Sequence, residues 1–161
     1  MNNDLIQVWR NRSEKDTRQV FDFLDELTFN RSEQIDAEAS VLHKEIFTEI
    51  NCLDCANCCK TTPAVLLSSD IKRIAKFLKI SPKLFVRKYV LEDINGELSF
   101  RKVPCVFLEA DNKCAVYAVR PVACKDYPHT ESSGFLRRRK LHKANVKICP
   151  ASYFILKRMD K

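Results

Sequence analysis

The sequence contains very little glycine. Of its 161 residues, only Gly96 and Gly134 are glycine. Loops that bring backbone N–H groups close to phosphates need several glycines at fixed spacing, so phosphate-binding and dinucleotide-binding loops are excluded. A nucleophile elbow needs a glycine on each side of its serine, and neither glycine is placed in that way. Most familiar nucleotide chemistry and this type of serine hydrolase chemistry are therefore ruled out.

The sequence also lacks a long apolar run. Charged residues interrupt every hydrophobic stretch, and none approaches the roughly 18 apolar residues of a transmembrane helix. The first residues, Met1 to Arg10, show neither the basic start and apolar segment nor the cleavage site of a secretory signal. We therefore expect a soluble, cytoplasmic protein with no membrane partner. Disulfides are rare in that reducing compartment.

No catalytic constellation is visible. His43, His129 and His142 are the only imidazoles, and no single cysteine is set apart as a protease nucleophile. Adjacent carboxylates such as Asp25-Glu26 and Glu92-Asp93 are typical of solvated surface. The sequence therefore leaves open whether the protein is an enzyme.

Cysteine, by contrast, is abundant. Four of the eight cysteines lie between positions 52 and 59, and three of these repeat at a spacing of three. Cysteines that merely fill a core need no such spacing. A metal centre does, because its thiolates must lie about 2.3 Å from the metal, and two intervening residues let a turn aim both sulfurs inward. The candidate metal ligands are Cys52, Cys55, Cys58, Cys59, Cys105, Cys114, Cys124 and Cys149.

Sulfur ligands indicate a soft metal. They select zinc, iron–sulfur clusters or Cu(I) over magnesium and calcium. Cys52, Cys55 and Cys58 have the leading spacing of bacterial ferredoxins, whose fourth ligand is a cysteine followed by proline, as in Cys149-Pro150. The residues alone leave both zinc and iron open as the cofactor, the latter including a 4Fe-4S cluster.

Two of the cysteines, Cys58 and Cys59, are adjacent. Side chains of neighbouring residues usually point in different directions, so joint ligation of one centre is awkward. We therefore expect the two thiols to serve different centres. Cys58 is expected to join the two cysteines before it, and Cys59 to point toward Cys105, Cys114 or Cys124.

Much of the chain favours helix. Residues 4–50 contain no glycine or proline and repeat apolar residues at helical spacing, which predicts two or three helices with apolar faces in the core. Ser81-Pro82 predicts the start of a helix, and Asn95-Gly96 predicts a hairpin turn. Arg120-Pro121 and Pro150 predict two further helix starts.

These elements predict an α+β fold. We expect a mainly helical small domain with short β-hairpins, organised around a cysteine metal site. An N-terminal helical segment, residues 1–50, is expected to pack on a cysteine-cluster metal-binding domain, residues 51–161.

Charge is unevenly distributed along the chain. Residues 1–50 carry 6 basic and 11 acidic side chains, whereas residues 132–161 carry 9 basic and 1 acidic. We expect the basic segment, which includes Arg137-Arg138-Arg139-Lys140, to be solvated or to dock on the acidic helices. A dense basic run can also neutralise phosphates, but few aromatic residues are interleaved with it to stack bases. A nucleic-acid partner is therefore the weaker alternative.

Several blocks taken together resemble a known family. They are the run from Cys52 to Cys59, the segment Pro104-Cys105-Val106-Phe107-Leu108, and the segment from Cys114 to Pro128. In this order they are similar to the CxxCxxCC cysteine-cluster (YkgJ-like) family over roughly residues 51–150. The resemblance implies a domain that chelates zinc or iron, with all eight cysteines as ligands and Arg120 and Pro121 as structural members of the motif. Family members often have glycine where Ala56 or Asn57 stands here.

Three functions are compatible with these patterns. The first is a metal-binding protein whose zinc or iron–sulfur cluster is structural or carries electrons. The second, implied by the family's likeness to flagellin lysine-methylase proteins, is an iron–sulfur metalloenzyme. The third is a zinc-stabilised adaptor for nucleic acid or for a protein partner. Catalytic zinc needs an open coordination position, so a closed four-thiolate site favours the adaptor over a zinc enzyme.

Overall fold

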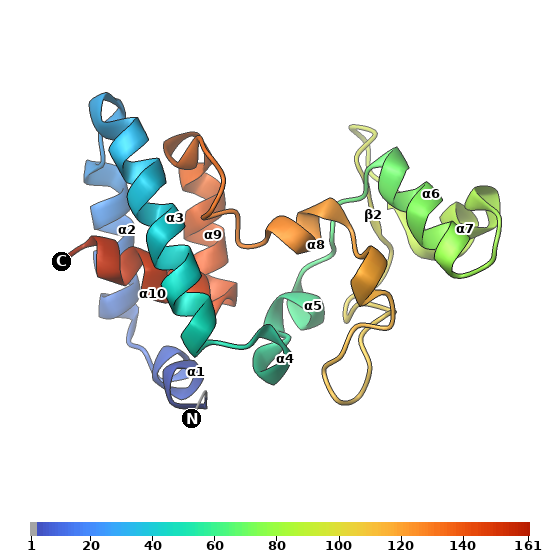
Figure 1. Ribbon diagram of the computed structural model, residues 1–161, viewed down its shortest axis with the longest axis horizontal. Helices are drawn as coiled ribbons and strands as arrows, with labels where there is room; N and C mark the ends of the chain where they lie inside the picture. The colour runs from blue at the N-terminus through green and yellow to red at the C-terminus, as the bar shows by residue number, and fades with distance from the viewer. Residues whose placement is uncertain (1–2) are drawn as a thin grey trace. The chain divides into compact units, whose positions relative to one another are not determined.

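The computed structural model describes residues 3–161 and divides into two compact units (Figure 1). The helical unit comprises Met1–Cys55 and Pro128–Lys161, and the cysteine-rich unit comprises Ala56–Tyr127. The boundary falls inside the cysteine run, and the two ends of the chain belong to one unit. No helix in the described part of the chain has both the length and the apolar character needed to cross a membrane.

Five helices of eight residues or more build the helical unit. They are α1 (Asn3–Arg10), α2 (Glu14–Glu26), α3 (Ser32–Glu49), α9 (Arg139–Ile148) and α10 (Pro150–Met159). Shorter pieces are α4 (Cys52–Cys55) and the 3-10 helices η1 (Phe29–Arg31) and η3 (Phe135–Arg138). The segment without glycine or proline thus forms α1, α2 and α3, which confirms the predicted helices.

The last helix, α10, is the centre of the helical unit. It makes its most extensive contact with α3 and its next most extensive with α9. Tyr153, Ile155 and Leu156 of α10 are almost completely buried, as are Leu24 of α2 and Ile46 of α3. The apolar residues at helical spacing therefore form a core, as expected.

Charged contacts fix the basic C-terminal segment within the same unit. Lys143 Nζ lies 2.5 Å from Asp25 Oδ2, and Arg158 Nη2 lies 2.7 Å from Glu49 Oε1. Arg139 Nη2 donates to the backbone carbonyl of Leu27 at 2.6 Å. The expected docking of this segment on the acidic N-terminal helices is confirmed.

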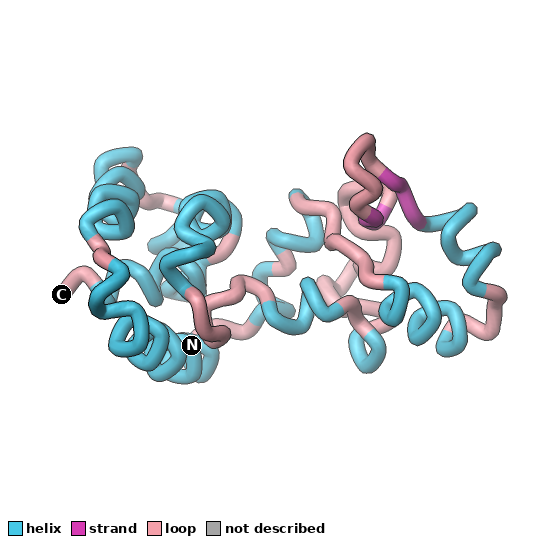
Figure 2. The backbone as a smooth tube through the Cα atoms, turned by 90° about the horizontal axis from the view of Figure 1, so that it is seen from above, coloured by secondary structure: helices cyan, strands magenta, loops and turns pink. Residues whose placement is uncertain are grey.

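The cysteine-rich unit combines short helices with one small sheet (Figure 2). Its helices are α5 (Asn57–Thr61), α6 (Ser68–Phe77), α7 (Pro82–Tyr89), η2 (Tyr117–Val119) and α8 (Val122–Asp126). Ser81 caps α7 and Pro82 occupies its first turn, as predicted. Strands β1 (Val90–Glu92) and β2 (Leu98–Phe100) pair antiparallel across the Asn95-Gly96 turn. The described chain is therefore a mainly helical α+β fold, as expected.

A core of aromatic and aliphatic side chains supports the loops of the cysteine-rich unit. Phe107 packs against Phe85 and Phe100, with ring centroids 6.4 and 5.4 Å apart. Val116 is buried in the same cluster. Phe107 follows Cys105 by two residues and Val116 follows Cys114 by two residues. The core therefore anchors the two loops that carry these cysteines.

Candidate metal centre

The cysteine run folds as two very short helices that meet at Ala56. This residue follows the last residue of α4 and is the N-cap of α5. Its backbone is left-handed, with φ 49° and ψ 20°, and its side chain is buried. An alanine pays roughly 1 kcal/mol or more for this conformation, whereas glycine adopts it freely. The conformation explains why glycine suits this point of the motif.

Four thiols of the cysteine-rich unit act electrostatically on one another. The backbone N–H of Cys105 donates to the carbonyl of Cys59 at 2.8 Å, and Cys114 pairs with Leu108 in an isolated β-bridge. Cys124 comes from α8. Burial, followed by the electrostatic effect of the three other thiols, raises the pKa of Cys124 to about 12. Cys59 thus lies beside Cys105 along the backbone and acts electrostatically on Cys124, and its place in one centre with these cysteines stays a prediction.

Backbone N–H groups are directed at two of these sulfurs. Cys105 accepts hydrogen bonds from the N–H groups of Phe107 and Leu108, and Cys114 accepts one from that of Val116. These bonds favour the thiolate. Burial has the larger effect and raises the pKa of both thiols. The N–H groups thus favour the thiolate form of these two sulfurs, whereas burial favours the neutral thiol.

The adjacent Cys58 also belongs to the cysteine-rich unit. Its Sγ lies 4.0 Å from Sγ of Cys59, and this contact is the largest of the effects that raise the pKa of Cys59. Two sulfurs bound to one tetrahedral zinc lie about 3.8 Å apart, since each Zn–S bond is about 2.3 Å. The side chains are thus less divergent than expected, and the assignment of Cys58 and Cys59 to different centres stays a prediction.

The helical unit holds a second group of cysteines. Cys149 is buried at the N-cap of α10, where its Sγ accepts the backbone N–H of Ser152 at 3.5 Å. Burial raises the pKa of Cys149 to about 12, and the neighbouring thiols of Cys52 and Cys55 contribute to the rise. Cysteines from the two chain segments of this unit therefore act electrostatically on one another.

The donor chemistry fits a soft metal, although the thiols are not drawn into coordination geometry. All eight cysteines are free thiols. Within residues 3–161, no group of three or more His, Cys, Asp or Glu side chains is arranged so that it could hold a metal ion. Buried thiols raise one another's pKa because two neighbouring thiolates would repel each other. A bound cation neutralises the thiolates and so removes this effect. Metal binding would therefore draw these side chains together.

A comparison with protein families agrees with this chemistry. Residues 51–150 match the model of the CxxCxxCC family, described as a putative zinc- or iron-chelating domain. The chain belongs to the CxxCxxCC family. The match covers more than half of the chain and includes every cysteine. Searches of curated proteins and of solved structures returned no match.

In this CxxCxxCC protein a buried carboxylate positions the helix that carries Cys124. Asp70 is completely buried, and its Oδ1 accepts hydrogen bonds from Arg73 Nη2 at 2.6 Å and from the backbone N–H of Val122 at 3.2 Å. Arg73 Nη2 also donates to the carbonyl of Arg120 at 2.9 Å. Sequence analysis missed this role, because residues 70 and 122 are far apart in the sequence.

Arg120 has a structural role, as the family resemblance implies. Its guanidinium lies 4.0 Å above the ring of Tyr117, and its Nη1 donates to the Tyr117 carbonyl at 3.1 Å. Pro121 follows as the N-cap of α8. These contacts hold the turn between η2 and α8, which lie between Cys114 and Cys124 in the sequence.

Two of the three histidines make packing and hydrogen-bond contacts within the helical unit. His142 stacks on Phe135 with ring centroids 4.0 Å apart, and its Nε2 lies 3.1 Å from the Phe135 carbonyl. Burial lowers the pKa of His142 to about 4. His43 Nδ1 lies 2.8 Å from Thr130 Oγ1. Both imidazoles therefore serve packing and hydrogen bonding.

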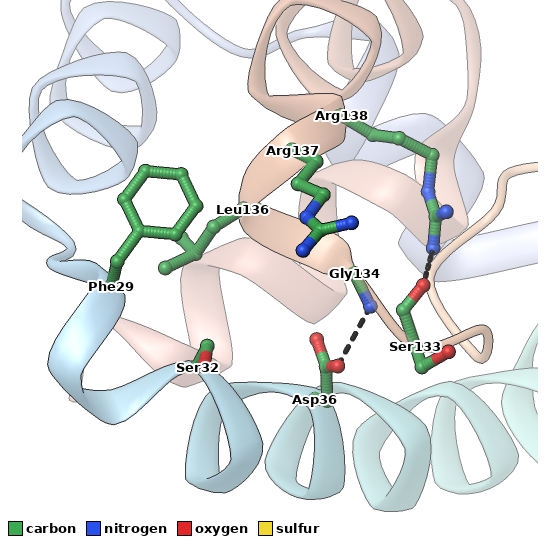
Figure 3. Close-up of a pocket in the computed structure, with 8 residues that line it drawn as sticks. All are labelled: Phe29, Ser32, Asp36, Ser133, Gly134, Leu136, Arg137 and Arg138. Carbon is green, nitrogen blue, oxygen red and sulfur yellow. Dashed lines mark hydrogen bonds between the residues drawn. The ribbon is translucent and has the colours of Figure 1, made fainter.

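A pocket of about 370 Å3 in the helical unit lies apart from the cysteines (Figure 3). Asp36 accepts the backbone N–H groups of Gly134 and Phe135 at 2.7 and 2.9 Å, which fixes the start of η3. Arg138 donates to a neighbouring carbonyl, that of Ser133, at 2.6 Å. The guanidinium of Arg137 points into the pocket (Figure 3). No cysteine is among the residues that line this pocket.

Proposed function

We propose that this protein binds zinc or an iron–sulfur centre as a thiolate complex, with Cys59, Cys105, Cys114 and Cys124 as the ligands of one centre in the cysteine-rich unit. The observation that carries the proposal is the match of residues 51–150 to a zinc- or iron-chelating domain, and within it the backbone N–H of Cys105 bonds the carbonyl of Cys59 at 2.8 Å. A cysteine that only fills space in an apolar core does not require backbone N–H groups directed at its sulfur. Thiolate ligands do benefit from them.

The number of thiols favours a structural or electron-carrying metal. Four thiolates complete the coordination of zinc and also suffice for an iron–sulfur cluster. A zinc ion held in this way has no open position for substrate or water. The binding free energy instead stabilises the folded unit, because no preformed site exists in the unfolded chain. We propose this role ahead of a metalloenzyme resembling the lysine-methylase proteins, because no contact among the described residues points to a particular reaction.

Metal analysis of the intact chain tests the proposal. Protein purified anaerobically is expected to give one of two results. It is colourless and contains stoichiometric zinc, or it is brown and contains iron and sulfide. The variant Cys105→Ser/Cys114→Ser is expected to lose the metal of this centre. The matched variant Val106→Ser/Ala115→Ser changes two exposed neighbours and should keep it. A wild-type chain without metal, or a cysteine variant with unchanged content, would refute the proposal.

A further inference from the structure

The pocket of the helical unit is separate from the chemistry of the cysteines. Its lining comes from η1, from the first turns of α3, from η3 and from the loop before η3 (Figure 3). Its volume is about 370 Å3. Pockets that bind small molecules have volumes of roughly 300 to 1,000 Å3. This pocket is therefore large enough for a small ligand.

Hydrogen bonds hold the walls of this pocket in place. Asp36 of α3 accepts the backbone N–H groups of Gly134 and Phe135, which ties the start of η3 to α3. Gly134 has φ 79°, a left-handed conformation that glycine adopts without strain. Arg138 Nη2 donates to the carbonyl of Ser133 at 2.6 Å and so fixes the loop before η3. The pocket is thus formed by the protein's own contacts, before any ligand binds.

Arg137 supplies the pocket with a charged group that is available to a ligand. Its guanidinium points into the pocket, and its side chain makes no ion pair or hydrogen bond with any residue that the structure describes (Figure 3). The guanidinium of Arg138 and the carboxylate of Asp36 are engaged with backbone groups. Two guanidinium groups and one carboxylate give the lining a net charge of +1. The pocket therefore favours an anion.

Phe29 and Leu136 give the same pocket an apolar wall. Leu136 is 4% exposed and belongs to the core, whereas Phe29 is 61% exposed. Water therefore reaches much of the phenyl ring of Phe29. An apolar group that packed on this ring would remove part of its surface from water, which is favourable. The lining thus suits a ligand with an apolar part as well as a negative charge.

We infer that this pocket binds a small organic oxyanion, a carboxylate or a phosphate carried on an apolar group. Arg137 would bind the oxyanion, because the planar guanidinium matches carboxylate and phosphate oxygens with two parallel hydrogen bonds. Phe29 would pack on the apolar group. Ser32 and Ser133 add hydroxyl groups that can donate to the same oxygens. The inference does not depend on the proposed metal site.

Binding of two model anions to the intact, metal-loaded chain tests the inference. Ligand-detected NMR titrations are expected to show saturable binding of benzoate, of phenyl phosphate or of both. Binding of benzoate alone would assign the pocket to carboxylates, and binding of phenyl phosphate alone would assign it to phosphates. Benzyl alcohol, which has the ring but no charge, should bind more weakly than the anion. Saturable binding of neither anion would overturn the inference.

A pair of variants shows whether the anion binds at the guanidinium of the pocket. Arg137→Gln should weaken binding by about tenfold or more, because charge-assisted hydrogen bonds are lost. Lys140→Gln removes the same charge at an exposed position that does not line the pocket, and it should bind as the wild type does. Equal affinity in Arg137→Gln and wild type would contradict the inference, as would equal weakening in the two variants.

A second pair of variants tests the apolar wall. Phe29→Ser should weaken binding of the aromatic anion, because the ring contact is lost. Phe77→Ser removes an exposed ring of α6 in the cysteine-rich unit and should leave the affinity unchanged. Equal affinities of the two phenylalanine variants would show that Phe29 does not contact the ligand and would overturn the assignment of an apolar group.

Discussion

At the scale of single residues, Ala56 is placed where glycine would be less strained. Its φ of 49° lies in the left-handed region. Ala56→Gly should raise the free energy of unfolding by about 0.5 to 1 kcal/mol, because relief of strain outweighs the greater entropy of the unfolded chain. Ala37→Gly, at an exposed position of α3, should lower it by about 1 kcal/mol. Urea unfolding of the metal-loaded protein measures both, and equal destabilisation would contradict the account.

Asp70 is the residue whose loss should disturb the cysteine-rich unit most directly. Its carboxylate accepts three hydrogen bonds, from Leu67 N, Arg73 Nη2 and Val122 N. In Asp70→Asn the amide cannot accept all three, and Arg73 loses its counter-charge, so stability should fall by about 2 to 3 kcal/mol. Because the Arg73 side chain is 38% exposed, solvent screens part of its interaction with Asp70, which limits the loss of stability.

Hydrogen exchange locates the effect of Asp70→Asn. Amides of α6 and α8 should lose protection, while those of α10 in the helical unit should not. Asp126→Asn, at an exposed carboxylate that ends α8, serves as the control and should leave the protection pattern unchanged. Equal protection in Asp70→Asn and wild type would show that the buried carboxylate does not hold α8.

His142 should make the helical unit sensitive to acid. Its pKa is lowered to about 4, first by burial and then by the charge of Arg138, whereas the unfolded chain titrates near 6.5. Between these values the unfolded state binds more protons, so stability falls as pH drops from about 6.5 to 4, by about 3 kcal/mol in all. The effect is absent above pH 7, where neither state is protonated.

A variant isolates this contribution from other acid-sensitive groups. His142→Gln is less stable at pH 7 because it loses the stacking on Phe135, but this deficit should shrink by about 3 kcal/mol between pH 7 and pH 4. Lys140→Gln, at an exposed position of the same helix, should follow the wild-type pH dependence. A deficit that stays constant with pH would contradict the assignment.

At the scale of elements, two neighbouring arginines report what the basic segment does. Arg139 donates to the Leu27 carbonyl and is partly buried, whereas the Arg137 side chain is exposed and makes no ion pair or hydrogen bond within the described chain. Arg139→Gln should lower stability by about 1 kcal/mol, and Arg137→Gln by less than about 0.5 kcal/mol.

If the segment bound nucleic acid instead, Arg137→Gln would weaken a salt-sensitive complex with DNA or RNA. We expect no submicromolar complex at physiological ionic strength in a fluorescence anisotropy titration.

Elements with strong local determinants could be predicted from the sequence. Ser81-Pro82 starts α7 and Asn95-Gly96 joins β1 and β2, since a cap and a turn depend only on adjacent residues. The helical nature of α9 was left open. Its buried residues include the polar His142 and Asn145, so its sequence does not show a purely apolar face.

Contacts between distant residues limited the prediction of the candidate site. The cysteines themselves were evident from their number and spacing. Their grouping was only partly evident: the ferredoxin-like spacing associates Cys149-Pro150 with Cys52 and Cys55, whose thiols act electrostatically on Cys149. Asp70 is not among the residues that the sequence singles out, and its bond to Val122 depends on how α6 packs near the turn before α8. Packing brings such pairs together, and single-sequence patterns do not record it.

At the scale of the whole molecule, the family match and the two units divide the chain differently. The match covers residues 51–150, and therefore includes Cys149 but not the rest of α10. The helical unit supplies the N-terminal helices and α10 around the first and last cysteines of the match. The segment that matches the family thus extends into the helical unit, although most of that unit lies outside the match.

X-ray absorption spectroscopy at the edge of the bound metal tests the central claim most directly. The intact, anaerobically purified protein is measured after its metal has been identified. The account predicts a first coordination shell made predominantly of sulfur, at about 2.3 Å if the metal is zinc. A first shell of nitrogen and oxygen atoms at about 2.0 to 2.1 Å, with no sulfur contribution, would contradict thiolate binding by these cysteines.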